Sequence, residues 1–106
     1  TMSIVSVVAI ITTKPGKRDE VLAAARGNLA AVRAEDGCIE YVPHIDTEGM
    51  GSFQTEFGPD TFVFVEKWES KEALGAHAVA PHMKAYAAKV GDLLESRVIH
   101  VISSAE

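Results

Sequence analysis

The chain has 106 residues, of which 47% are hydrophobic and 24% are charged, and its formal net charge is −5. This length predicts one globular domain, residues 1–106, and the scattered basic residues argue against nucleic acid as a partner, because phosphate binding needs clustered Lys and Arg. The single cysteine, Cys38, excludes an internal disulfide and a metal site built around several thiols.

The first apolar run, Ile4–Thr13, is rich in β-branched residues on both faces, which predicts a central strand. Its apolar part, Ile4–Ile11, is too short to span a bilayer and does not resemble a signal peptide. We therefore expect a cytoplasmic protein without a membrane partner.

A helix is expected over Lys17–Glu35, where apolar residues recur at helical spacing, with Gly37 as its C-terminal stop.

The segment Cys38–Ile45 predicts a second strand, at an edge of the sheet or bulged because Pro43 cannot donate a ladder hydrogen bond. The glycines and polar residues of Asp46–Asp60 predict a long loop, with a short extended piece at Ser52–Phe57. Such a loop is typical of a lid or a contact surface.

The second half of the chain predicts a strand, a split helix and a last strand. Thr61–Glu69 is the strand, and Ser70 is a suitable N-cap for a helix over Lys71–Ala80. Pro81 breaks this helix, and a new apolar stripe continues to Gly91. The β-branched run Ser96–Ile102 predicts the fourth strand.

The order of these elements, β-α-β-β-α-β, predicts an α+β, ferredoxin-like fold, an antiparallel sheet with helices on one face and the second helix split. Several strands are apolar on both sides, while the helices suffice to cover one face. We therefore expect a homodimer in which two sheets pack face to face.

The richest candidate site follows from strand alternation, which places Phe62, Phe64, Glu66 and Trp68 on one face. His77, on the next helix, is the candidate base, and Glu66 is a second candidate whose pKa burial would raise. Two structural interpretations stay open. His77 can simply bond a backbone carbonyl, and Glu66 can be a buried carboxylate paired with Arg97, His77 or a backbone amide.

Met83 and Tyr86 complete the expected apolar wall around these groups. No metal site is expected, because His77 and His82 are five residues apart, do not share a helical face and are separated by Pro81. Phosphate-cradling and dinucleotide-binding glycine motifs are absent from the sequence, so no cofactor is expected either.

The motifs G-C-x-x-Y (from Gly37), F-V-x-x-E-x-W (from Phe62) and A-L-x-x-H (ending at His77) resemble the antibiotic biosynthesis monooxygenase family, in its quinol monooxygenase branch. The resemblance implies a dimeric α/β barrel and oxygen insertion into quinol or polycyclic hydroxylated aromatics with O2, without metal or flavin. His77 and Glu66 are then the catalytic residues, and Phe62, Phe64, Trp68, Met83 and Tyr86 bind the aromatic.

This chain departs from two relatives. Phe64 stands where anthrone-oxidising members have an asparagine, and Tyr86 where haem-degrading relatives have a haem-ligating histidine, so haem degradation is not expected. Two alternatives to the oxygenase stay open on the same scaffold. One is a non-catalytic binding or stress-response dimer, and the other is a cofactor-free isomerase.

Overall fold

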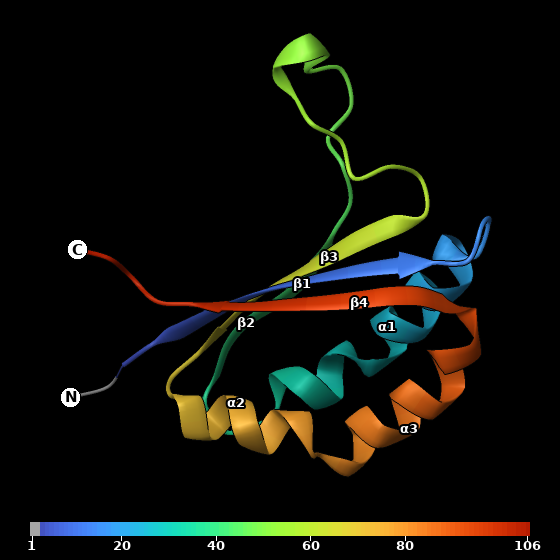
Figure 1. The fold of residues 1–106 in the computed structure, drawn as a ribbon. Helices are drawn as coiled ribbons and strands as arrows, with labels where there is room; N and C mark the ends of the chain where they lie inside the picture. The colour runs from blue at the N-terminus through green and yellow to red at the C-terminus, as the bar shows by residue number, and fades with distance from the viewer. Residues whose placement is uncertain (1–2) are drawn as a thin grey trace.

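The computed structural model describes residues 3–106 and has the predicted order of elements (Figure 1). Four antiparallel strands form one sheet in the order β2-β3-β1-β4, which is the ferredoxin-like arrangement. The bounds of its helices and strands are β1 Val5–Thr13, α1 Arg18–Arg33, β2 Cys38–His44, β3 Thr61–Trp68, α2 Lys71–Ala78, α3 Pro81–Val90 and β4 Leu94–Ile102. The α+β fold class and the split second helix are confirmed.

The helices begin and end where local chemistry favours it. The Ser70 hydroxyl caps α2 by accepting a hydrogen bond from the Ala73 amide at 3.0 Å, and Pro81 opens α3 at a position that needs no amide donor. α1 ends at Arg33, two residues before the expected end, and Gly37 turns the chain into β2 with φ of +85°. Glu35 is therefore in a turn and not in a helix.

One face of the sheet carries the core. On the two central strands, Ala9 pairs with Phe64 and Val7 with Glu66, and all four side chains face the helices. The three helices lie on this side of the sheet, as Figure 1 shows. The predicted common face of Phe62, Phe64, Glu66 and Trp68 is confirmed, because all four are buried on that side.

On the opposite face of the sheet, residues 3–106 place no helix (Figure 1). Val8 and Ile10 of β1 are half-buried there, and Val98 of the edge strand β4 pairs with Ile10 and is 46% exposed. The sheet is open within the chain. β4 begins two residues before the predicted strand, lies at the edge of the sheet and is exposed along nearly its whole length.

The segment between β2 and β3 is a loop that projects from the sheet (Figure 1), as predicted. The expected extended piece at Ser52–Phe57 begins instead as a 3-10 turn at Gly51–Phe53, and the backbone becomes extended at Gln54. Asp46 closes the base of this loop by accepting hydrogen bonds from the amides of Phe57 and Gly58.

Within residues 3–106 no helix has the length and hydropathy required to cross a membrane.

Candidate active site

A cavity of about 630 Å³ lies between the helix-covered face of the sheet and helices α2 and α3. Volumes of this size are typical of sites for small organic ligands. Its lining is mainly apolar and includes Ile11, Phe64, Leu74, Ala87, Val90 and Ile99. The cavity therefore offers an aromatic ligand a largely apolar surface.

His77 lines this cavity from the last turn of α2 and is only 6% exposed. Its Nδ1 atom lies 2.8 Å from Glu35 Oε2. The ring is therefore held by a carboxylate, and not by a backbone carbonyl as in the purely structural interpretation of this histidine. The ring also packs against Trp68, with 4.6 Å between ring centroids, and meets the edge of Tyr41 at 5.4 Å. Three contacts thus fix its orientation.

Glu66 also lines the cavity and is 4% exposed. Its Oε1 atom accepts a hydrogen bond from Trp68 Nε1 at 2.9 Å, a partner that differs from those expected for a buried carboxylate here. Burial raises the pKa of Glu66, while the Trp68 hydrogen bond and the neighbouring His77 and Arg97 act in the opposite direction. The net result is a carboxyl group with an elevated pKa, beside the same cavity as His77.

Five of the seven predicted site residues share the cavity, namely Phe64, Glu66, His77, Met83 and Tyr86. Phe62 and Trp68, which we expected in the wall, lie outside the lining and are fully buried. Both support residues of the lining from behind. The Phe62 ring packs edge-on against the Phe64 ring, with 5.3 Å between ring centroids, and Trp68 donates a hydrogen bond to Glu66. Direct contact of these two residues with a ligand stays a prediction.

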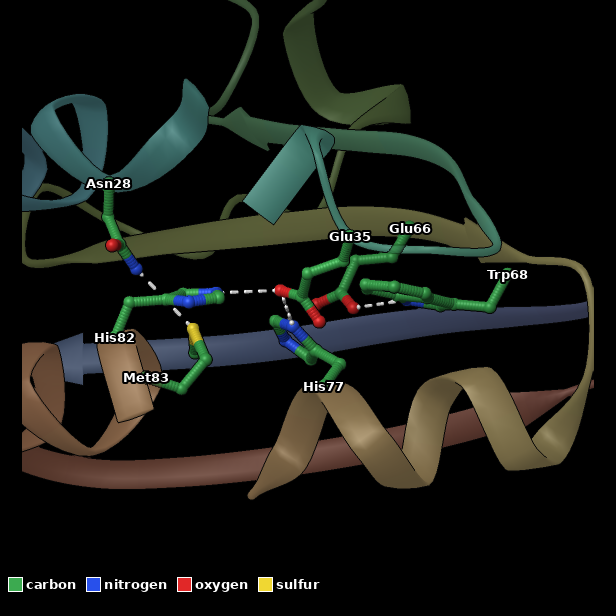
Figure 2. A network of polar contacts seen from close by, with 7 residues as sticks. All are labelled: Asn28, Glu35, Glu66, Trp68, His77, His82 and Met83. Carbon is green, nitrogen blue, oxygen red and sulfur yellow. Dashed lines mark hydrogen bonds and ion pairs between the residues drawn. The ribbon is translucent and has the colours of Figure 1, made fainter. Parts of the chain in front are cut away.

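Glu35 and His82 are the functional candidates that the sequence did not reveal. His82, in the first turn of α3, places Nε2 2.8 Å from the Glu35 oxygen that also binds His77 (Figure 2). The chain turns at Ala80, whose backbone is extended, and this turn brings the start of α3 back toward the end of α2. From their five-residue spacing we expected His77 and His82 to point in different directions. That argument assumed one continuous helix, whereas the two histidines lie on two separate helices.

The side chains of Glu35, His77 and His82 are also the donor set that could hold a metal ion. One ligand atom from each lies within 4.8 Å of the other two. Their side chains are 13%, 8% and 29% exposed, so the cluster lies mostly inside the protein and is most open at His82.

The cavity has two phenols and three cationic side chains. Burial raises the pKa of Tyr86 to about 12 and that of Tyr41 well above its usual range, so both are neutral at physiological pH. Positive charge comes from Lys71, Lys84 and Arg97, and none of the three has a salt-bridge partner within residues 3–106. These charges favour an anionic ligand.

Comparison with known proteins identifies the family of the chain. The sequence model of the family "Antibiotic biosynthesis monooxygenase" matches residues 4–89. The protein described as "Probable quinol monooxygenase YgiN" of Escherichia coli (strain K12) is 42% identical over 96 residues, covering 88% of this chain and 91% of that protein. The chain therefore belongs to the antibiotic biosynthesis monooxygenase family.

Solved structures show the same fold. The structure of Rv0793 from Mycobacterium tuberculosis superposes with a TM-score of 0.79 at 28% identity, over 98% of this chain and 97% of that one. PA3566 from Pseudomonas aeruginosa gives a TM-score of 0.80 at 24% identity, over 98% and 96% of the two chains.

Proposed function

We propose that this member of the antibiotic biosynthesis monooxygenase family oxidises a quinol or a related hydroxylated aromatic with O2 and without a cofactor. The observation that carries the proposal is the buried imidazole of His77 in an apolar cavity, with its Nδ1 atom bound to Glu35. A carboxylate on Nδ1 fixes the tautomer in which Nε2 has a free lone pair. Within residues 3–106 no hydrogen bond involves His77 Nε2, so it is available as a base.

The proposed chemistry starts with proton transfer from a substrate hydroxyl to His77. The resulting phenolate is electron-rich and donates one electron to O2, which gives a substrate radical and superoxide. These two recombine through a carbon–oxygen bond, and the protonated His77 returns its proton to form a hydroperoxide. The ring hydrogen then leaves as a proton, the O–O bond breaks and water departs. One oxygen atom stays in the product as a carbonyl and the other leaves in water, so no reductant is needed.

The surroundings of His77 suit these steps. Phe64, Met83 and Tyr86 offer apolar contact to a flat ring, and exclusion of water protects the reactive intermediates. Lys71, Lys84 and Arg97 favour the phenolate over the phenol. Glu66, with its elevated pKa, assists or orients the reacting groups as a second proton-transfer residue.

We also propose that the protein is a cytoplasmic homodimer joined through the helix-free faces of two sheets. On that face Val8, Ile10 and Val98 present apolar surface that no helix in the described part of the chain covers. Contiguous apolar surface of this kind favours association, and a two-fold axis lets the same patch serve both partners.

The test of function is oxygen consumption by metal-stripped, flavin-free protein with a panel of quinols and anthrones. We expect uptake above autoxidation, one atom of ¹⁸O from ¹⁸O2 in the product, and a loss of about 100-fold or more in His77→Ala. His44→Ala is the matched control, because His44 is exposed and its ring contacts the Val42 carbonyl oxygen at the surface.

Each other outcome has a meaning. Uptake that survives in His77→Ala would overturn the assignment of the base. Turnover that leaves the substrate mass unchanged would identify the isomerase. Ligand-induced thermal stabilisation without turnover would identify the binding dimer.

A further inference from the structure

We propose that Glu35, His77 and His82 form a binding site for a divalent transition-metal ion, with Zn²⁺ as the probe. Three segments meet at this cluster: the turn after α1 supplies the carboxylate, the end of α2 supplies His77 and the start of α3 supplies His82 (Figure 2). The three ligand atoms, Glu35 Oε2, His77 Nδ1 and His82 Nε2, are the atoms that already converge.

The donor chemistry fits such an ion. Two imidazole nitrogens with one carboxylate oxygen is a common set for Zn²⁺ and other first-row divalent metals, and three protein ligands leave positions for water. In the structure each nitrogen lies 2.8 Å from the oxygen. Ligands held tetrahedrally at about 2.0–2.1 Å from an ion are about 3.3–3.4 Å apart, whereas the three ligand atoms here lie within 4.8 Å of one another, so both imidazoles would have to shift around the ion.

The electrostatics also fit. Within residues 3–106, the ion-pair partners of Glu35 are these two histidines, and no Lys or Arg competes for its charge. An ion there would replace two N–H hydrogen bonds with two metal–nitrogen bonds. Because the three ligands come from separate segments, the ion would also tie the start of α3 to the end of α1.

Occupation of the site has a consequence for His77, and this part rests on the proposed function. A neutral imidazole has one N–H and one free lone pair. When Nδ1 binds a metal, Nε2 must carry the hydrogen and can no longer accept a proton. The metal-bound and proton-accepting states of His77 are therefore mutually exclusive, and the site is inhibitory.

The experiment titrates metal-stripped protein with Zn²⁺ in competition with a chromophoric chelator. We expect saturable binding of one ion per chain, weakened by about 10-fold or more in His82→Gln, since loss of one ligand costs at least as much as loss of a supporting partner. The glutamine amide can still donate to Glu35 and so spares the fold. His44→Ala should bind Zn²⁺ like the unmodified protein.

Two further readouts complete the test. Side-chain ¹⁵N NMR of the unmodified protein should show His77 changing from the Nδ1–H to the Nε2–H tautomer on Zn²⁺ addition. Absence of saturable binding, an unchanged His77 tautomer, or equal binding in His82→Gln would overturn the site. Zn²⁺ binding without loss of His77-dependent oxygen uptake would overturn the inhibitory role and leave the site standing. Absence of any oxygenase activity would count against the proposed function alone, because the binding readouts do not need turnover.

Discussion

Glu35 and His77 are 42 residues apart in the sequence, yet Glu35 Oε2 lies 2.8 Å from His77 Nδ1 inside the protein. Glu35 reaches this position because α1 ends at Arg33 and the following turn directs its side chain toward α2 (Figure 2). A carboxylate in this place orients the imidazole and stabilises the imidazolium that forms when the ring accepts a proton.

Replacing Glu35 with Gln should therefore lower kcat by about 10-fold or more, with a smaller change in KM, because the amide no longer stabilises the imidazolium. Side-chain ¹⁵N NMR should show that His77 loses its preference for the Nδ1–H tautomer. Glu48→Gln, in the exposed loop, is the control for loss of a carboxylate elsewhere. An unchanged kcat together with an unchanged tautomer would remove the positioning role.

Glu66 should make stability depend on pH. Its folded-state pKa is raised by burial, so its contribution to stability is fully present below the unfolded pKa, about 4.3, and is lost as the pH rises through the folded pKa. We expect Glu66→Gln to gain stability relative to the unmodified protein when the pH rises from about 4 to about 7. The amide oxygen can still accept the Trp68 hydrogen bond.

The measurement for Glu66 is urea unfolding of both proteins at the two pH values. Glu40→Gln is the control on the neighbouring strand, where the side chain is 42% exposed and the carboxylate lies 3.9 Å from Lys67 Nζ. The same stability difference at both pH values would contradict the raised pKa.

Gly37 should tolerate no side chain. Its φ is +85°, and an added Cβ would lie 2.6 Å from the Ala73 Cβ of α2. Gly37→Ala should cost roughly 1–2 kcal/mol for the backbone conformation alone, and the contact with α2 should add to this. Gly27→Ala is the matched control, because its Cβ would meet nothing within 4 Å and the change should stabilise α1 by about 0.5–1 kcal/mol. Chemical denaturation measures both, and equal stability of the two variants would contradict the packing argument.

Val98 should report on the dimer. It is 46% exposed at the edge of the helix-free face, so Val98→Asp should leave the folded chain intact and place an unpaired charge in the proposed interface. Light scattering should show a shift from dimer to monomer. Val79→Asp, 63% exposed between α2 and α3, should leave the mass unchanged. A monomeric unmodified protein, or a dimeric Val98→Asp, would remove the proposed interface.

Sequence alone determined the fold, because strands and helices follow from local periodicity and from residues such as Ser70 and Pro81 whose preferences act within a few positions. It also placed Phe64 and Glu66 on the cavity side of β3, since alternation along a strand needs no tertiary knowledge. The motifs and the fold agree with the family to which the chain belongs.

Tertiary structure alone decided the partners of the ionisable groups. Nothing local indicates that Glu35 meets His77 and His82, because the meeting depends on where α1 ends and how the chain turns at Ala80. Depth in the core likewise separates Trp68, which is fully buried, from Phe64, which lines the cavity on the same face. A strand pattern specifies a side, whereas the packing of helices against that side determines which of its residues a ligand can reach.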